Sequence, residues 1–276
     1  MSTLRLEGTP NFRDLGGLAT VDGRVTRHGV LFRSSALEEL SARDVRLLTD
    51  DLGLRTVIDL RSADDRESAQ PLLGTPVRYI NLPISRGGPT TSLERPMGAD
   101  GRVDMPRIYR MYIDVSAPSI REIIAELTSG ATPAVFHCAA GKDRTGVVAA
   151  ILLSAVGVTR NAVIADFMDT EPALGDIIAY LQRRPAYADV VLRFPPGTMD
   201  VDPKFMSDFL DDVERSYGGM SSWLTEHAGV TAESIARLEQ LLVEPRTKST
   251  SDGTLGPKGP RARYRDGSTR GDPKGP

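Results

Sequence analysis

The chain has 276 residues, 40% of them hydrophobic and 26% charged, a composition typical of a globular protein with one large domain or two small ones. A single cysteine excludes an intrachain disulfide, and together with only three histidines it argues against a zinc site of the usual Cys/His spacing. The net charge is −3, but residues 245–276 contribute +5 from eight Lys/Arg and three Asp/Glu. Residues 1–244 therefore carry −8, and we expect no nucleic-acid partner.

The first part of the chain carries signals for strands and for one helix. Residues 17–33 are expected to form a hairpin with an Asp-Gly turn. A helix is predicted over Ser41–Gly53, because Ser41 followed by Asp44 is typical of a capping box and Gly53 of a helix end. The β-branched apolar run Leu54–Leu60 predicts a buried strand, and Val77–Ile84 predicts a second one.

The second part alternates between helix and strand before it becomes helical. A helix is predicted from Ser116 to Gly130 and a short apolar strand over Ala134–Cys138. The helix expected over residues 146–157 is apolar on every face and should be buried. From Thr159 to Glu244 we expect helices only. The order of elements predicts an α/β fold with a mostly parallel central sheet flanked by helices and a helical C-terminal half.

The last 32 residues differ in composition from the rest of the chain. They are rich in Pro, Gly, Ser and basic residues, so they bury too little surface to offset the entropy of ordering. We therefore expect a folded domain over residues 1–244 and a disordered basic tail over residues 245–276. There is no apolar N-terminal leader and no run of roughly 18 apolar residues, so we expect a cytoplasmic protein without a membrane span, with export lacking a signal peptide left open.

The cysteine, Cys138, lies in the string VFHCAAGKDRTG, between a predicted strand and a predicted buried helix. Ligands of α/β proteins bind at this end of a strand, and a helix N-terminus attracts anions. Arg144, six positions after Cys138, can grip two oxygens of a phosphoryl group, and the same field favours the thiolate as a nucleophile that would form a phosphocysteine. The residues whose backbone could bind the phosphate are Ala139, Ala140, Gly141, Lys142, Asp143 and Arg144.

Neighbouring residues are expected to support this loop. The side chain of His137 should point away from that of Cys138, because the two are consecutive along a strand, and we expect it to order the loop through hydrogen bonds. Thr145 could donate its hydroxyl to the thiolate. Gly141 and Gly146 suit a loop with unusual backbone angles and a closely packed helix start.

The string HCAAGKDRTG resembles the HCxxGKDRTG signature of atypical protein tyrosine phosphatases of the mycobacterial tyrosine phosphatase B type. NFRDLGG, LFRSSAL, DLRS and SYGG also resemble that family, in the same order, so that the likeness covers roughly residues 8–244. It implies a cysteine-based phosphatase fold without metal or cofactor, acting on phosphotyrosine and often on phosphoserine/threonine or phosphoinositides. By motif position Cys138 is the nucleophile, Arg144 clamps the phosphate, and Lys142 adds charge beside it and links the family to inositol phospholipids.

The general acid is the least determined part of the predicted site. A leaving oxygen needs a proton, best supplied by an aspartic acid. The region after the second strand, Asn81–Pro89, where the family's acid has also been sought, has no carboxylate. We therefore predict Asp143 as the acid, with Asp59, Asp100 and Asp104 as alternatives. A salt bridge or helix cap that orders the loop is the other interpretation of Asp143.

The other matching segments contain Arg13, Asp14, Arg33 and Arg61, each near a predicted strand end. If these ends converge, the arginines add positive potential, although Arg61 is as well explained by a structural salt bridge. We predict a metal-independent protein tyrosine phosphatase, with dual specificity left open. A phosphoinositide phosphatase with the same loop is the alternative, and an inactive phosphate-binding module is a remote one. Whether Pro172–Phe205 covers the site as a lid is also open.

Overall fold

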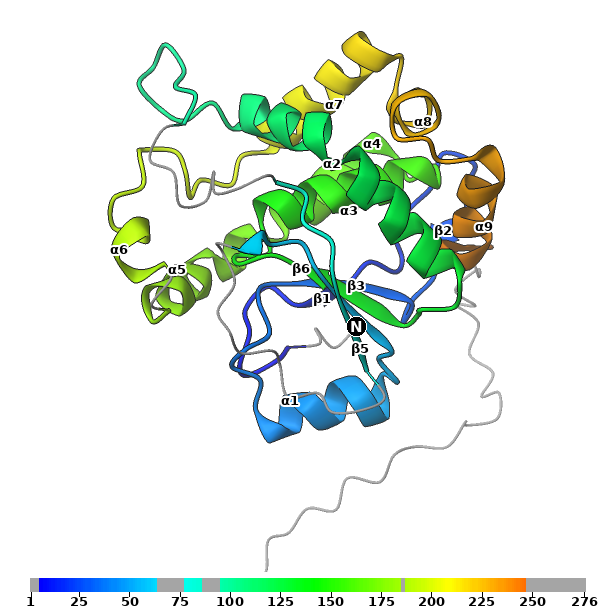
Figure 1. The fold of residues 1–276 in the computed structure, drawn as a ribbon, viewed down its shortest axis with the longest axis horizontal. Helices are drawn as coiled ribbons and strands as arrows, with labels where there is room; N and C mark the ends of the chain where they lie inside the picture. Colours follow the sequence, from blue (N-terminus) through cyan, green and yellow to red (C-terminus); the bar gives the residue numbers. More distant parts are fainter. Residues whose placement is uncertain (1–4, 64–76, 86–94, 185–186, 247–276) are drawn as a thin grey trace, which may run out of the picture. The chain divides into compact units, whose positions relative to one another are not determined.

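The central sheet of the fold has five strands in the order β1-β3-β6-β4-β5 (Figure 1). β3, β6, β4 and β5 run parallel, and β1 pairs antiparallel with β3 at one edge, which confirms the predicted mostly parallel sheet. The computed structural model describes residues 5–63, 77–85, 95–184 and 187–246. The strands are β1 Arg13–Asp14, β3 Leu31–Ser34, β4 Thr56–Asp59, β5 Arg78–Asn81 and β6 Ala134–His137.

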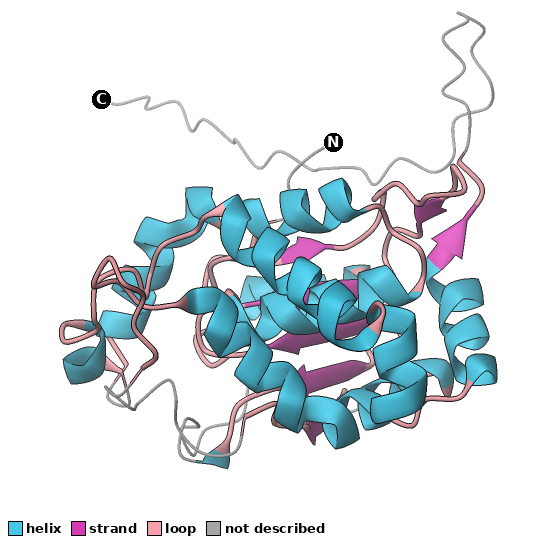
Figure 2. Ribbon diagram, turned by 90° about the horizontal axis from the view of Figure 1, so that it is seen from above, coloured by secondary structure: helices cyan, strands magenta, loops and turns pink. Residues whose placement is uncertain are grey.

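Helices cover both faces of this sheet (Figure 2). Alternate strand residues point to opposite faces. Val135 of β6 packs in one cluster with α1 (Ala42–Arg46) and its continuation η1 (Leu47–Asp51), whereas Phe136 packs on the other face with α2 (Met105–Thr128) and α3 (Asp143–Ala155). Figure 1 shows α1 on one side of the strands and α2 and α3 on the other.

The C-terminal half is almost entirely helical. Its last two residues before the predicted tail, β7 (Val243–Glu244), pair with β2 (Val25–Thr26) in a small second sheet, so the expectation of helices only is wrong at both residues of β7. The further helices are α4 Arg160–Met168, η3 Glu171–Ala173, α5 Leu174–Gln182, α6 Ala188–Val191, α7 Pro203–Tyr217, α8 Met220–Ser222, η4 Trp223–His227 and α9 Ala232–Leu242.

Two local predictions near the N-terminus are confirmed. Ser41 accepts from the backbone N–H of Asp44, whose side chain accepts from the N–H of Ser41, so the capping box forms. The Asp-Gly turn also forms, with Gly23 N–H donating to Thr20 at 3.2 Å and residues 19 and 25 bridged. The hairpin is limited to residues 17–26, however, because residues 31–34 instead enter the central sheet as β3.

The prediction that a helix begins at Ser116 is wrong, because α2 begins at Met105. Asp104 caps α2 by accepting from the N–H of Arg107 at 3.1 Å, and Pro106 occupies its first turn, where a missing N–H has no cost. Pro118 lies inside the helix and does not end it, because the apolar face of α2 is buried along its length.

α3 is the helix predicted to be apolar on every face, and nearly all of its residues are buried, as predicted. It begins at Asp143, so Asp143 and Arg144 belong to its first turn rather than to a loop. Among the residues that the structure describes, no helix is long and apolar enough to cross a membrane. Of the predicted tail, residues 245–276, all but the first two residues lie outside the described residues, so the predicted domain boundary stays a prediction.

Candidate active site

Cys138 lies at the carboxyl end of β6, the central strand of the sheet. Its neighbours β3 and β4 are parallel to β6, so three strand ends meet around the thiol. Cys138 is buried, and five residues separate it from Arg144 in the first turn of α3. The fold thus places the thiol where α/β proteins bind ligands and at the N-terminus of a buried helix.

The segment after Cys138 is held from outside by its carbonyl oxygens. The N–H of Ala36 donates to the carbonyl of Ala139 at 3.1 Å, and the hydroxyl of Ser35 donates to that of Ala140 at 2.8 Å. In a trans peptide the N–H points opposite to the carbonyl. The amides that follow these carbonyls therefore point to the inner side of the loop, as the binding of an anion requires.

Gly141 receives two further donors. Arg33 Nη2 donates to its carbonyl at 2.8 Å and Asn11 Nδ2 at 2.9 Å. Gly141 has φ +65°, and a Cβ at this position would lie 2.5 Å from the carbonyl of Ser34. Only glycine fits here, because the backbone angle and the contact both exclude a side chain.

Arg33 and Arg13 form a buried ionic cluster with Asp166 beneath the loop. Arg33 Nη1 lies 2.5 Å from Asp166 Oδ2, and Arg13 Nε lies 2.9 Å from Oδ1. Burial, with the charge of Arg13, lowers the pKa of Arg33 to about 10. Burial acts to raise the pKa of Asp166, but the two arginines outweigh it and lower that pKa. Arg33 holds the loop directly. The two arginines share one carboxylate, so the cluster keeps one positive charge, and the expectation that they add positive potential to the site stays a prediction.

A small cavity of about 30 Å³ lies over Cys138. On the other side of this cavity lie residues of the segment that we call the cover segment, residues 174–184 and 187–199. The region Pro172–Phe205, for which the sequence left a lid open, thus contributes residues over the site. At ~10–15 Å³ per water, the cavity has room for about two or three waters. The lining residues are Arg95, Tyr112, Cys138, Ala139, Ala140, Asp143, Arg144, Leu181, Tyr187, Phe194, Thr198 and Met199.

Lys142 is turned away from the cavity and is completely buried. Its Nζ donates to Asp143 Oδ1 at 2.7 Å and to the carbonyl of Asp200 at 3.0 Å. The alternative of an exposed lysine is therefore wrong, because a buried ammonium needs a carboxylate partner and takes Asp143. That Lys142 adds its charge beside the phosphate stays a prediction. Asp143 itself lines the cavity together with Arg144.

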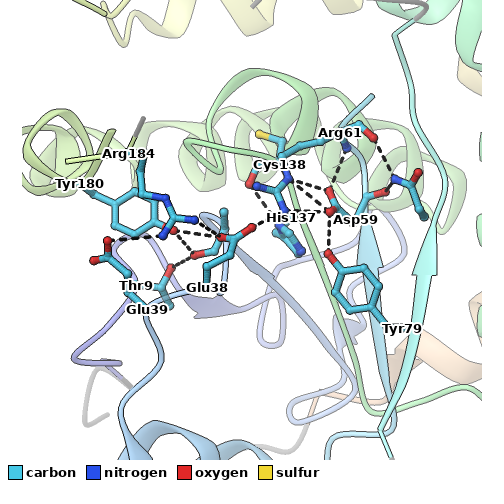
Figure 3. A network of polar contacts seen from close by, with 12 residues as sticks. Thr9, Glu38, Glu39, Asp59, Arg61, Tyr79, His137, Cys138, Tyr180 and Arg184 are labelled. Carbon is cyan, nitrogen blue, oxygen red and sulfur yellow. Dashed lines mark hydrogen bonds and ion pairs between the residues drawn. The ribbon is translucent and has the colours of Figure 1, made fainter. Parts of the chain in front are cut away.

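Asp59 and Arg61 form a buried pair behind the thiol (Figure 3). Arg61 Nη2 lies 2.9 Å from Asp59 Oδ2, which also accepts from the hydroxyl of Tyr79 at 2.6 Å. Burial acts to raise the pKa of Asp59, but His137 and the hydrogen bonds from Arg61 outweigh it and lower the pKa well below its ordinary value. Asp59 is thus engaged in an ion pair and, unlike Asp143, does not line the cavity, and the structural salt bridge of Arg61 is confirmed.

Glu38 connects this pair to the cover segment. It accepts from Arg61 Nη2 at 2.5 Å and from the hydroxyl of Tyr180 on α5 at 3.2 Å, and Arg184 Nη2 lies 3.5 Å away. Figure 3 shows these side chains in one row from Tyr79 to Arg184, with Cys138 beside it. One buried carboxylate therefore links the strand ends at the active site to the helix that covers them.

The two predicted supporting residues beside the loop, His137 and Thr145, differ in outcome. The Nδ1 of His137 contacts the carbonyl of Cys138 at 3.1 Å, as its predicted ordering role requires, and burial lowers the pKa of His137. Thr145 is buried, but its hydroxyl makes no hydrogen bond within the described part of the chain. Its predicted bond to the thiolate is therefore not formed in this structure.

The other predicted aspartates lie away from the cavity. Asp104 caps α2, and Asp100 accepts from the N–H of Arg102 in an exposed turn. Asp14 accepts from the N–H groups of Gly16 and Gly29. In the described ranges, no three His, Cys, Asp or Glu side chains come together to hold a metal ion. That the reaction needs no metal stays a prediction.

The structure also identifies residues that the sequence did not single out. Tyr109 of α2 donates to Asp143 Oδ1 at 2.7 Å, Tyr112 and Arg95 line the cavity, and Asn11 holds Gly141. Asn11 lies in the string NFRDLGG, so the resemblance could have found it. Tyr109 carries no local signal, because it reads as one more residue of an apolar helix face.

A thiol and an arginine in a Cys-x5-Arg loop between a central parallel strand and a buried helix define a cysteine-dependent phosphatase. The chain belongs to the tyrosine phosphatase family, which it matches over residues 4–244. It is 27% identical over 228 residues to a Cupriavidus necator protein provisionally named a tyrosine-protein phosphatase, covering 81% of this chain and 83% of the relative. It is also 27% identical to the triple specificity protein phosphatase PtpB of Mycobacterium tuberculosis, over 88% of this chain and 100% of the relative.

Solved structures also share parts of the fold. P. aeruginosa TpbA in complex with pTyr is 23% identical, with a TM-score of 0.32, over 61% of this chain and 86% of that one. The core catalytic domain of a PP-IP phosphatase from S. cerevisiae is 14% identical, with a TM-score of 0.37, over 72% and 91%. These TM-scores are too low to support a conclusion of their own.

Proposed function

We propose that this tyrosine phosphatase hydrolyses phosphotyrosine in proteins, with Cys138 as nucleophile and Arg144 as phosphate clamp. One observation carries the proposal: the outward-held carbonyls turn the loop amides inward at the cavity that Cys138, Arg144 and Asp143 line. The amides and the guanidinium would share the three non-bridging oxygens of the phosphoryl group. The thiolate is then placed in line behind the phosphorus.

The reaction has two steps. In the first, the thiolate of Cys138 attacks phosphorus, the bond from phosphorus to the ester oxygen breaks, and the leaving oxygen takes the proton of Asp143. In the second, water attacks phosphorus, its proton passes to the Asp143 carboxylate, and the sulfur–phosphorus bond breaks to release inorganic phosphate and the thiolate. Of the four aspartates considered, Asp143 is the one that lines the cavity.

Phosphotyrosine is the favoured substrate class, and phosphoserine/threonine peptides are the natural second group to test, because one relative is named a triple specificity phosphatase. Phosphoinositides are disfavoured, because Lys142, the residue that suggested them, is buried against Asp143. A thiolate without a second cysteine also needs a compartment that keeps it reduced, which favours the cytoplasm.

The test is phosphate release from a phosphotyrosine peptide, a phosphothreonine peptide and vesicles containing inositol phospholipids, in the presence of a metal chelator. We expect the highest kcat/KM on the phosphotyrosine peptide and no loss with the chelator. Cys138→Ser should have no measurable activity on any of them. Loss of activity on chelation, or a serine variant as fast as the wild type, would contradict the proposal.

The role of Asp143 is tested by how the effect of its replacement depends on the leaving group of the substrate. Asp143→Asn should slow an aryl phosphate with a poor leaving group by about 10²-fold or more and one with a good leaving group far less, because the latter needs little proton transfer. An equal effect on both substrates would assign Asp143 a structural role.

A further inference from the structure

Tyr109 directs its hydroxyl at the carboxylate that the proposed mechanism uses as its acid. The phenol oxygen lies 2.7 Å from Asp143 Oδ1. This hydrogen bond joins the second turn of α2 to the first turn of α3. No signature or relative discussed above assigns this tyrosine a role. We propose that Tyr109 is a positioning residue that fixes which oxygen of Asp143 carries the proton, an inference that rests on the proposed function.

The ring of Tyr109 is buried against two phenylalanine rings. It is fully buried, with Phe167 edge-on at a centroid distance of 6.2 Å and Phe209 edge-on at 6.1 Å. Burial, with the charge of Asp143, raises the pKa of Tyr109 well above its ordinary value, so the phenol stays neutral and always donates. A buried tyrosine hydroxyl needs a partner, and here the partner is Asp143.

Lys142 gives Asp143 a second donor at the same atom. Its Nζ lies 2.7 Å from Oδ1, the oxygen that also accepts from Tyr109. Lys142 in turn is fixed by the carbonyl of Asp200 at 3.0 Å. Oδ1 is thus occupied by two donors from the buried side, whereas the Asp143 side chain is 22% exposed and lines the cavity.

These two donors define which oxygen of the Asp143 carboxyl carries the proton. A protonated carboxyl has one O–H, and placing it on Oδ1 would set it against two donors that already point there. The proton therefore resides on Oδ2, the remaining oxygen, and this oxygen is the one available to the ester oxygen of a bound substrate. Preorganisation of this kind lowers the barrier because the acid needs no rotation at the moment of transfer.

The charged and titratable groups around Asp143 come from the loop and α3, from α2, and from the segment before α2. Lys142, Arg144 and Cys138 belong to the loop and α3, and Tyr109 and Tyr112 belong to α2. Arg95 lines the same cavity. Of these, Tyr109 and Lys142 make hydrogen bonds to the carboxylate in the described part of the chain, so they are the groups whose removal should act on it directly.

The test is Tyr109→Phe, which removes one oxygen and keeps the ring. We expect kcat for an aryl phosphate with a poor leaving group to fall about tenfold, while kcat for one with a good leaving group stays within about twofold.

Tyr217→Phe is the matched control, because Tyr217 also donates to an aspartate, Asp114 Oδ1 at 2.9 Å, away from the cavity. It should leave the ratio of kcat values on the two leaving groups unchanged. In an Asp143→Asn background, Tyr109→Phe should cause no further loss on the poor leaving group. An equal loss on both substrates, or an additive loss in the double variant, would overturn the proposal.

Separate experiments test whether Tyr109→Phe folds and whether the proposed function holds. Thermal melting establishes whether Tyr109→Phe folds, and if it does not, Lys142→Met removes the other donor to Oδ1 and should give the same leaving-group-selective loss. A selective loss is expected in either variant, and its absence in a folded variant overturns the positioning role. The role of Cys138 is unaffected by that outcome, because it is tested by Cys138→Ser.

Discussion

Arg33 donates a hydrogen bond of 2.8 Å to the carbonyl oxygen of Gly141, from a strand 108 residues earlier in the chain. The same guanidinium lies 2.5 Å from Asp166 on α4, so one buried side chain ties β3, the phosphate loop and α4 together. The planar guanidinium of Arg33, held by Asp166, therefore fixes the shape of the loop. The chemistry of the site depends on a residue that does not line its cavity.

Replacing Arg33 should damage both stability and catalysis. In Arg33→Met the loop loses its anchor, and Asp166 keeps only Arg13, so we expect a loss of unfolding free energy of about 3 kcal/mol. A displaced loop should also lower kcat/KM by about 10²-fold. Urea unfolding measures the loss of unfolding free energy. Inhibition by inorganic phosphate measures how well the displaced loop still binds an anion. Arg33→Lys keeps the charge without the fork and should be intermediate, whereas unchanged phosphate affinity in Arg33→Met would show that the loop holds itself.

Removing the charge of Glu38 should loosen the cover segment. Glu38→Gln weakens the links to Arg61, Tyr180 and Arg184, and the amides of α5 should exchange with deuterium about tenfold faster. Cys138 should then be inactivated faster by hydrogen peroxide, because α5 contributes to its burial.

Glu39 provides the control for this prediction. Its side chain is 34% exposed, and its ion pairs with Arg183 and Arg184 lie near the surface, where such pairs contribute little. Glu39→Gln should leave the exchange of α5 and the peroxide rate unchanged. If the two variants behave alike, Glu38 has no special part in holding the cover segment.

The stability of the N-terminal region should depend on pH through Asp44. Burial acts to raise its pKa, but hydrogen bonds from the backbone N–H groups of Glu7, Ser41 and Gly8 outweigh it and lower the pKa. A lowered folded-state pKa contributes stability that is present above the ordinary aspartate pKa, about 3.9, and is lost as the pH falls through the folded value.

Asp44→Asn should therefore cost about 1–2 kcal/mol at neutral pH, and the difference from the wild type should shrink below about pH 4. Urea unfolding across pH 2–7 measures it, with the activity at neutral pH as the check that the active site is intact. A difference that stays constant with pH would contradict the role of the ionised carboxylate.

Features encoded by near neighbours in the chain could be predicted. The capping box of Ser41, the strand before Cys138 and the buried helix after it follow from spacing and apolar pattern alone. The predicted start of α2 at Ser116 is wrong although Asp104 and Pro106 carry the signal for its start at Met105, and Pro118 lies inside the helix. A proline inside a helix is tolerated where tertiary packing outweighs the lost hydrogen bond.

Features that depend on distant residues could not be predicted. Lys142 stands in the signature, but only the fold brings Asp200 to it and so buries it. Likewise Asp166 becomes the partner of Arg33, and Tyr109 the partner of Asp143, across separations that no local pattern reports. The motif therefore predicted which residues are at the site, and the tertiary structure decides where their side chains point.

The central claim is that phosphate transfer passes through the sulfur of Cys138. The most direct measurement is rapid acid quenching during turnover of an aryl phosphate, followed by mass spectrometry of the peptide that contains Cys138. The account predicts a phosphoryl group on Cys138 that forms within the first turnover, decays when substrate is exhausted, and persists longer when Asp143→Asn slows hydrolysis. Steady turnover with no phosphoryl group on Cys138, or with one on another residue, would contradict it.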